Sequence, residues 1–285
     1  MIFGLGAALG WGISDLLAAI VARRIGSAAL AVGAQIVGLL GYAFLIVVTQ
    51  PSLDVPRVDV VAMLGAGLAG GIAYLSLYRG LEIGPIALVS PIVSAFAAVT
   101  IVLAVAILHE SLHGAVLAGA IVTLVGVVLA STDLRLLRAE RTRGAGTAGV
   151  PFALLAMAGF GIAAFISGHL AKQFGWLVPI AISRASGAAM ICAVIFTTRR
   201  DVLRGQPASG LLLAAVVGVT DIVGISMFAL GAERGLISIV VAASASFTIL
   251  PVVGGLVLFR ERPVLNQGIG VLMVIGGLLL LGLSS

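Results

Sequence analysis

Two similar segments of the sequence decide the fold of this chain. The first reads GPIALVSPIVSAFAAVTIVLAVAILHESL (Gly84–Leu112), and the second, of the same length, reads GLISIVVAASASFTILPVVGGLVLFRERP (Gly235–Pro263). Each runs without a charge for about 20 residues, which is the length of a membrane-spanning helix, and then reaches a glutamate, Glu110 or Glu261. Six of the 29 aligned positions are identical, and the two glutamates form one of these pairs. We therefore predict a duplicated chain whose halves contain equivalent membrane helices.

The composition of the chain also indicates a membrane protein. Hydrophobic residues make up 61% of the 285 residues, charged residues only 9%, and the mean hydropathy is +1.27. A soluble domain carries about 25% charged residues, and a soluble chain of this size could not hide so much apolar surface. Most of the chain must therefore be surrounded by lipid. We predict an all-α polytopic membrane protein without a large polar domain.

Ten apolar runs are separated by turn residues or charges, and each is expected to form a transmembrane helix. The runs cover residues 2–22, 29–48, 59–78, 85–107, 113–131, 151–171, 178–197, 210–230, 236–258 and 264–283. Typical boundaries are the polar stretches Arg23–Gly26 and Arg79–Gly80. The longest connection, 132–150, is expected to be a linker between two five-helix repeats, 1–131 and 151–285.

Further similarity between the halves supports the duplication. The matching elements are Gly10–Gly26 with Gly159–Gly175, and the pair Gly119 and Gly126 with the pair Gly270 and Gly277. An odd number of helices in the first half turns the second copy upside down in the bilayer. Inverted repeats around a central site are a recurrent transporter design, because exchange of the two halves' conformations opens the site to the other side. The alternative is a duplication that serves only the stability of the fold.

The basic residues are distributed unequally between the two sides of the predicted bundle. Connections after odd-numbered runs hold twelve of them: Arg23, Arg24, Arg79, Arg135, Arg138, Arg141, Arg143, Arg199, Arg200, Arg204, Arg260 and Arg262. Connections after even-numbered runs hold three: Arg57, Lys172 and Arg234. Because basic loops stay in the cytoplasm, we predict cytoplasmic odd loops and external termini.

Some kinds of site and partner are not expected from the sequence. The first run lacks the basic start of a cleaved signal peptide. The single cysteine, Cys192, lies in an apolar run, so we expect neither a disulfide nor a cysteine metal site. His109 and His113 straddle a loop and lack a third ligand, so no metal or other cofactor is expected. The basic residues are scattered through short loops, which does not indicate nucleic-acid binding, and no enzyme signature is present.

Four ionisable residues fall inside the apolar runs: Asp15, His169, Arg184 and Asp221. An unpaired charge is costly in lipid, so each should face the protein interior or a water-filled cavity. In our interpretation Asp15 or Asp221 binds the ammonium group of an amino acid, and Arg184 binds its carboxylate through the bidentate guanidinium fork. The alternative is that Arg184 pairs with one of the aspartates as a structural bridge, and that His169 lies at the membrane interface without a role.

Aromatic side chains are expected to shape the substrate site. Trp11 and Ser14 share a helical face with Asp15, and Tyr74 and Tyr78 lie one turn apart on another helix. A wall of rings with a few polar groups suits a substrate with an apolar body and polar anchors. The alternative for Trp11 and Tyr78 is a place in the aromatic belt at the membrane interface.

Hydroxyl groups recur at one-turn spacing in the duplicated segments, at Ser90, Ser94, Ser244 and Thr248. We predict that they contact substrate. Alternatively they satisfy backbone carbonyls that Pro91 and Pro251 leave free, or they allow close helix packing. The repeated glutamates, Glu110 and Glu261, are expected at helix ends, either as solvated surface pairs or as the latch of a gate.

Four short motifs carry a family resemblance. They are GWGISD (Gly10–Asp15), LYRGLEIGPIALVSP (Leu77–Pro91), AILHESL (Ala106–Leu112) and LFRERP (Leu258–Pro263). With the five-plus-five helix pattern they resemble the EamA-like branch of the drug/metabolite transporter superfamily, which implies export of amino acids and other small metabolites. Many members carry a proline at the positions of Ala97 and Thr248, whereas the prolines here are Pro91 and Pro251. Members also often have both termini in the cytoplasm, opposite to the orientation that the charges predict.

These features together predict a secondary transporter that exports amino acids or similar small metabolites across the bacterial inner membrane by alternating access. No nucleotide-binding loop is present, so a substrate gradient or a coupled ion would drive transport. The expected partners are a small-molecule substrate and the lipid bilayer. One alternative is a multidrug exporter, or an exchanger of phosphorylated sugars, which would need more buried basic residues than Arg184. Others are a membrane-embedded enzyme and a non-transporting membrane subunit.

Overall fold

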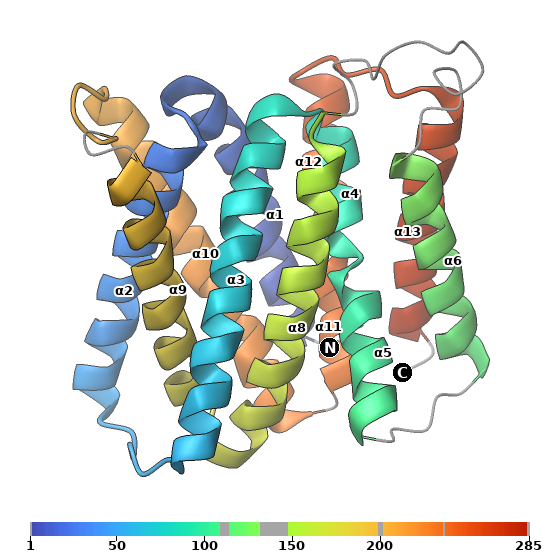
Figure 1. Ribbon diagram of the computed structural model, residues 1–285. Coiled ribbons are helices and arrows are strands. Elements are labelled where there is room, and N and C mark those ends of the chain that lie inside the picture. The colour runs from blue at the N-terminus through green and yellow to red at the C-terminus, as the bar shows by residue number, and fades with distance from the viewer. Residues whose placement is uncertain (1, 109–113, 132–147, 199–201, 236, 284–285) are drawn as a thin grey trace.

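The computed structural model describes residues 2–108, 114–131, 148–198, 202–235 and 237–283, and this part of the chain is almost entirely helical (Figure 1). The continuous helices are α1 (Ile2–Ile25), α2 (Ser27–Thr49), α3 (Arg57–Ile83), α6 (Gly114–Ser131), α8 (Val150–Phe174), α9 (Leu177–Thr198), α10 (Ala208–Arg234) and α13 (Leu265–Leu283). Two more rods are broken: α4 (Ile86–Ser94) with α5 (Phe96–Leu108), and α11 (Ile237–Ser244) with the 3-10 turn η2 (Ala245–Thr248) and α12 (Ile249–Val257). The described residues thus form ten rods, which confirms the predicted all-α fold.

The outward faces of the helices are apolar, as a lipid environment requires. Within the described residues, seven helical spans are long and apolar enough to cross a membrane, and shorter apolar helices follow near the C-terminal end. Large hydrophobic side chains are widely exposed, for example Leu40 at 65%, Phe44 at 66% and Leu272 at 70%. In water such a surface would drive aggregation. The structure is therefore that of a multi-pass membrane protein.

Two helices extend beyond the charges that were predicted to end them. The polar punctuation predicts ends before Arg23 and Arg79, but α1 and α3 continue through these residues. Arg23 donates a hydrogen bond to the carbonyl oxygen of Gly84 at 2.9 Å, and Arg79 pairs with Glu82 at 2.7 Å. Because both guanidinium groups find partners at the same end of the bundle, the further helical turns do not leave these two charges in contact with lipid alone.

The two duplicated segments break at equivalent places near their middle. The N–H of Ala95 bonds to the carbonyl oxygen of Ile92 at 3.2 Å, a tighter spacing than in an α-helix, and η2 takes the same place in the other half. The prolines do not mark these breaks, because Pro91 lies inside α4 and Pro251 lies in the first turn of α12. A helix tolerates proline in its first turn, where the missing N–H has no helical partner. The two breaks therefore lie at equivalent positions of the repeat and do not coincide with the prolines.

The second half runs in the opposite direction to the first. Arg23, near the end of α1, bonds to Gly84. A Cβ atom on Gly84 would lie only 2.8 Å from the Cα of Gly149, immediately before α8. The first helix of the first half thus ends where the first helix of the second half begins. This arrangement is the inverted orientation that an odd number of helices predicts.

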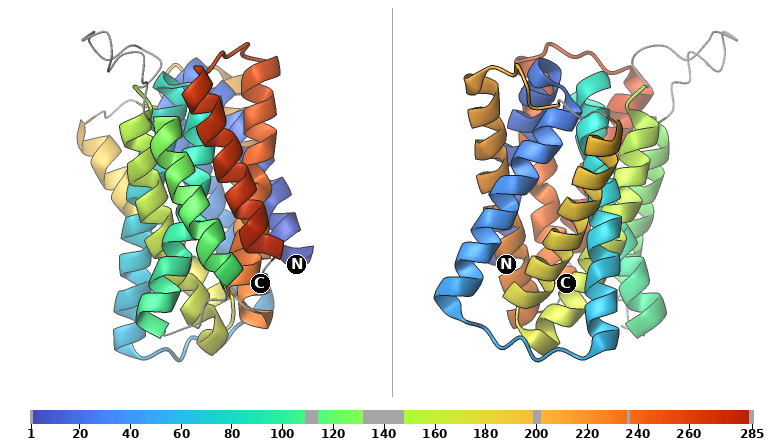
Figure 2. Two further views of the ribbon diagram at one scale, coloured as in Figure 1. Left: turned by 90° about the vertical axis from the view of Figure 1, so that its right-hand side faces the viewer. Right: turned by 60° about the vertical axis from the view of Figure 1, so that its left-hand side comes forward.

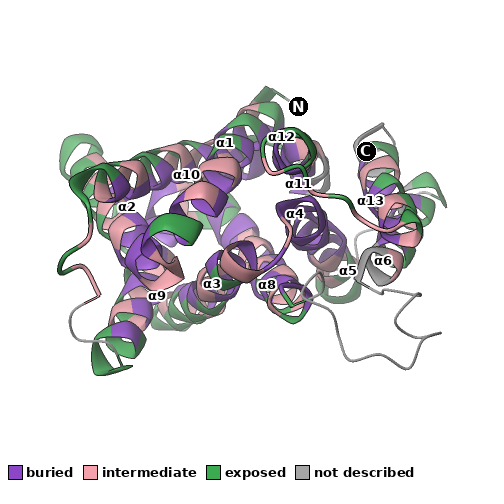
Figure 3. Ribbon diagram, turned by 90° about the horizontal axis from the view of Figure 1, so that it is seen from above, coloured by how far each residue is buried: buried purple, intermediate pink, exposed green. Residues whose placement is uncertain are grey.

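Equivalent residues also make reciprocal contacts across the bundle, as two halves related by a twofold axis would. A Cβ on Gly126 in α6 would lie 2.8 Å from the carbonyl oxygen of Gly270 in α13, and a Cβ on Gly277 in α13 would lie 2.8 Å from that of Gly119 in α6. These are the four glycines that the sequence comparison paired. Glycine lets the two backbones approach closely at both points. The helices α6 and α13 form a pair at one edge of the bundle (Figures 1 and 3).

Other helix pairs follow the same twofold relation between the halves. Helix α1 packs against α10, and α3, the counterpart of α10, packs against α8, the counterpart of α1. Helix α1 begins and α13 ends toward the same side of the bundle (Figure 2). The predicted repeat boundaries stay a prediction, because residues 132–147 of the linker lie outside the described residues.

Candidate substrate-binding cavity

A cavity of about 140 Å³ lies between the two halves. Its walls come from helices of both halves and include the start of α5 and the turn η2. The polar and aromatic residues of the lining are Trp11, Ser14, Asp15, Gln35, Tyr74, Tyr78, Phe96, Phe160, Ser167, Ser183, Arg184, Asp221, Phe228 and Phe247. The rest of the lining is aliphatic or glycine. The cavity is therefore a mostly apolar chamber with a small number of polar groups, as is typical of ligand sites.

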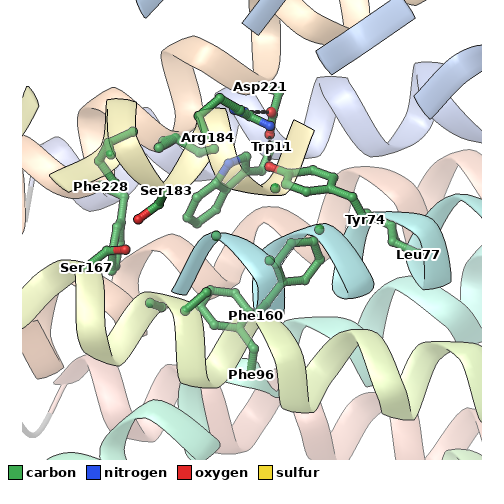
Figure 4. A pocket seen from close by; sticks show the side chains of 18 of the residues that line it. Trp11, Tyr74, Leu77, Phe96, Phe160, Ser167, Ser183, Arg184, Asp221 and Phe228 are labelled. Atoms are coloured by element: carbon green, nitrogen blue, oxygen red, sulfur yellow. Dashed lines mark hydrogen bonds and ion pairs between the residues drawn. The ribbon is translucent and has the colours of Figure 1, made fainter. Parts of the chain in front are cut away.

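The most polar feature of the cavity is a buried ion pair between Arg184 and Asp221 (Figure 4). The side chains are only 5% and 6% exposed. Arg184 also donates to Gln35 Oε1 at 3.0 Å, and Asp221 accepts a hydrogen bond from the Tyr74 hydroxyl at 2.7 Å. The guanidinium carbon lies 5.0 Å from the centre of the Tyr74 ring. The charge of Arg184 is thus compensated within the protein, as in the structural-bridge alternative, and Asp221 rather than Asp15 is its partner.

Asp15 is the second carboxylate of the cavity, and its surroundings differ. Its residue is 6% exposed, and it accepts one hydrogen bond, from the Ser90 hydroxyl to Oδ2 at 3.3 Å. In the described part of the chain no basic side chain lies within ion-pair distance of it. The neighbouring Ser14 hydroxyl turns to the carbonyl oxygen of Val217 at 3.3 Å. Asp15 is therefore a buried carboxylate with a neutral partner.

Trp11 is the centre of an aromatic cluster that forms one wall. Its ring lies 5.9 Å from Phe96, 5.7 Å from Phe228 and 6.0 Å from Phe247, measured between ring centroids. All three centroid distances fall in the range where aromatic side chains attract one another through edges and faces. The cluster joins α1 to α10 and to both broken rods. The sequence placed Trp11 in the cavity wall, and the structure shows it there.

Both predicted tyrosines also lie in the lining. Tyr74 packs edge-on against Phe160 at 4.9 Å and lies 5.8 Å from Tyr78, measured between ring centroids. Tyr78 is only 2% exposed. It therefore does not belong to an aromatic belt at the membrane interface, although Arg79 follows it in the sequence.

Five predicted site residues, Ser90, Ser94, His169, Ser244 and Thr248, lie outside the lining of the cavity. Ser94 and Ser244 are fully buried and bond to carbonyl oxygens of their own helices, Pro91 at 2.7 Å and Val241 at 2.8 Å. Thr248 is also fully buried, and its hydroxyl has no hydrogen-bond partner among the described residues. His169 bonds to Gln173 at 3.0 Å, one turn away on α8. Of the repeated hydroxyls, only Ser90 reaches the cavity chemistry, through Asp15.

Gln35 and the phenylalanines of the lining were not predicted from the sequence. Gln35 is a lone uncharged amide inside an apolar run, so the pattern of charged residues does not indicate it. Phe96 and Phe247 are equivalent positions of the duplicated segments, and Phe160 is the equivalent of Trp11. The alignment of the repeats would have indicated all three as a group, because equivalent positions next to a twofold axis face the same cavity.

The repeated glutamates can be assessed only in the second half, because Glu110 lies outside the described residues. Glu261 is not a solvated partner of the arginines beside it. Its carboxylate accepts the backbone N–H groups of Ile86 at 3.0 Å and Ala87 at 2.8 Å, in the first turn of α4, and pairs with Arg23 at 3.1 Å. Since a helix N-terminus favours a negative charge, Glu261 fastens the end of one half to the other half.

A metal site is not formed by the described residues, in which no three His, Cys, Asp or Glu side chains gather.

The chain is similar to known proteins in two respects. Residues 1–132 match the EamA-like transporter family. A solved structure described only as the crystal structure of a protein is similar over 99% of this chain and 96% of its own, with 17% identity and a TM-score of 0.69. At this identity the similarity shows the fold alone. No curated protein matches the chain.

Proposed function

We propose that the chain, whose residues 1–132 match the EamA-like transporter family, is a secondary carrier of the drug/metabolite transporter type. In this proposal it exports amino acids or similar small metabolites across a bacterial inner membrane. The substrate binds in the cavity between the halves and is released after the cavity opens to the other side. The observation that carries the proposal is the position of the cavity, which takes its lining from two halves of opposite orientation.

The inverted arrangement supports alternating access as the mechanism. When two halves make equivalent contacts, an exchange of their conformations closes one end of the cavity and opens the other. At the end where α1 finishes, Arg23 bonds to Gly84 and to Glu261, and Glu261 bonds to the start of α4. These bonds join the two halves over that end. Transport then requires that these bonds break when the cavity opens at that end.

The experiment that tests the proposed function is transport by the purified protein in liposomes. A panel of labelled amino acids and small metabolites is offered, and at least one should cross only when the protein is present. Trp11→Ala should lower this transport severalfold while the protein still inserts and folds, because Trp11 lines the cavity. Leu40→Ala, on the lipid-facing surface, is the matched control and should transport normally. Equal transport by Trp11→Ala and wild type would exclude this wall as the substrate site.

The orientation in the membrane is a separate part of the proposal. The excess of basic residues in the odd loops predicts that both termini lie outside the cytoplasm. A C-terminal alkaline phosphatase fusion should be active, and a fluorescent-protein fusion at the same place should be dark. The reverse pattern would invert the orientation and leave the fold and the cavity unchanged.

A further inference from the structure

The charges that line the cavity are unequal in sign. The described lining contains two carboxylates, Asp15 and Asp221, and one guanidinium group, that of Arg184. Among the described residues, Asp221 is paired with Arg184, whereas Asp15 has only the Ser90 hydroxyl as a partner. A charge inside a membrane protein is stabilised by an opposite charge or by a polar, hydrated cavity. The group that a cationic ligand could complement is therefore the Asp15 carboxylate.

The arginine offers no free edge to the carboxylate of an amino acid. Its Nη2 atom binds Asp221, its Nη1 atom binds Gln35, and one face of the guanidinium lies over the Tyr74 ring. On the Nε side the helix α2 passes so close that a Cβ on Gly38 would lie 3.2 Å from Nε. An incoming carboxylate would have to displace Asp221 and leave it buried without its partner, which is strongly unfavourable. An amino acid thus finds Asp15 as a partner for its ammonium group but finds no available partner for its carboxylate.

The wall beside Asp15 suits a cation with an apolar body. Trp11 lies one helical turn before Asp15, and its ring is surrounded by Phe96, Phe228 and Phe247 at 5.7–6.0 Å between centroids. Aromatic faces attract ammonium groups, and indole does so most strongly. A carboxylate next to such rings recognises both the charge and the apolar surface of an organic cation.

From these contacts we infer that the preferred substrates are monocations, namely amines or ammonium ions with an apolar or aromatic body and no carboxylate. This inference rests on the proposed carrier function, and it takes amines and ammonium ions, rather than amino acids, as the substrate class. In it Asp15 binds the cationic group, the aromatic cluster of Trp11 holds the body, and the pair of Arg184 and Asp221 keeps the opposite wall neutral.

The test uses labelled benzyltrimethylammonium, a fixed cation that does not leak through lipid, in liposomes that contain the purified protein. Wild type should take it up in a saturable manner. Unlabelled phenethylamine should compete, whereas phenylalanine, which differs from it only by the carboxylate, should compete at least about tenfold less well, since a charged hydrogen-bonding group is left unmatched. This comparison of ligands needs no variant and therefore does not depend on how a variant folds.

Variants locate the effect at the inferred group. Asp15→Asn should lower uptake of benzyltrimethylammonium about tenfold or more, while Asp54→Asn, the same substitution in an exposed loop, should leave it unchanged. Normal uptake by a folded Asp15→Asn variant would overturn the inference. If phenylalanine moves and benzyltrimethylammonium does not, the substrate class is wrong but the carrier function stands. If nothing in the panel moves, the proposed function fails and the inference fails with it.

Discussion

Equivalent glycines of the two halves occupy equivalent helix crossings. When the alignment of the duplicated segments is extended back through the preceding helix, Gly67 in α3 corresponds to Gly218 in α10. A Cβ on Gly67 would collide with the carbonyl oxygen of Ser183 in α9, and a Cβ on Gly218 would lie 2.8 Å from the carbonyl oxygen of Ala34 in α2. Ala34 and Ser183 are themselves equivalent positions. The framework of close backbone contacts is therefore the same in both halves.

The side chains that the halves present to the cavity are different at equivalent positions. Arg184 corresponds to Gln35, Asp221 to Gly70, and Asp15 to Ala164, and all six residues line the cavity. Gln35 and Arg184 even bond to each other, as equivalent groups next to a twofold axis can. The duplication thus preserves the packing that lets the halves exchange conformations, while the recognition chemistry has become asymmetric. Variants that disturb either the charges or the crossings separate these two roles.

The largest expected effect comes from breaking the asymmetric ion pair. Asp221→Asn leaves the Arg184 guanidinium buried without an opposite charge, so the free energy of unfolding should fall by about 3–5 kcal/mol. Thermal unfolding of the purified protein in detergent measures this loss. Asp15→Asn is the matched control, because Asp15 has no cationic partner among the described residues, and it should be close to wild type in stability.

A second variant tests whether the loss of stability comes from breaking the ion pair. Arg184→Gln combined with Asp221→Asn removes both charges and should recover much of the stability. A stable Asp221→Asn protein would contradict the structural bridge.

The next effect comes from the symmetric crossings. Gly67→Val should lower the free energy of unfolding by about 1–3 kcal/mol or more, because the added side chain has no room against α9. Gly218→Val should do the same against α2. Gly65→Val is the control, since a Cβ there meets no heavy atom within 4 Å. A drop in the unfolding temperature for only one of Gly67 and Gly218 would show that the crossings are not equivalent.

The fold was predictable because lipid imposes a simple pattern on the sequence. Uninterrupted apolar runs between charged connections located all ten rods, and the repeated glycines of α6 and α13 identified the halves. The helix ends were less predictable. Arg23 and Arg79 looked like boundaries, but their long side chains reach partners at the helix end, and a linear pattern does not contain such contacts between distant segments.

The cavity was only partly predictable for the same reason. The depth of Asp15, Arg184 and Asp221 in their runs indicated that they face the interior, but spacing along the chain does not rank helix neighbours. The choice between Asp15 and Asp221 as the partner of Arg184 depended on how α9 and α10 pack. Buried hydroxyls such as Ser94 and Ser244 were indistinguishable from ligand contacts in the sequence, because a serine that bonds to its own helix has the same spacing.

The smallest expected effect concerns the contact that fastens one end of the bundle. Glu261→Gln removes the charge that pairs with Arg23 and one of the two oxygens that accept N–H groups from Ile86 and Ala87. The Arg23 side chain is 30% exposed and that of Glu261 is 11% exposed, so the loss is modest, about 0.5–1 kcal/mol. Opening at that end should then become about two- to fivefold more frequent, since the variant weakens only the closed state.

Labelling of a cavity cysteine from each side of the membrane measures this shift. Ser167, which lines the cavity, is changed to Cys in a Cys192→Ser background and is treated with an impermeant maleimide. Glu261→Gln should increase labelling from the end where α1 finishes. The sequence alignment predicts that Glu110→Gln acts at the opposite end, so in this variant labelling of the cavity cysteine should rise from the other side of the membrane. Because the two glutamates are equivalent in the repeat, a carrier that alternates between states related by the twofold axis requires opposite shifts from the two variants. Shifts toward the same side would show that the repeat supports the fold but does not exchange conformations during transport.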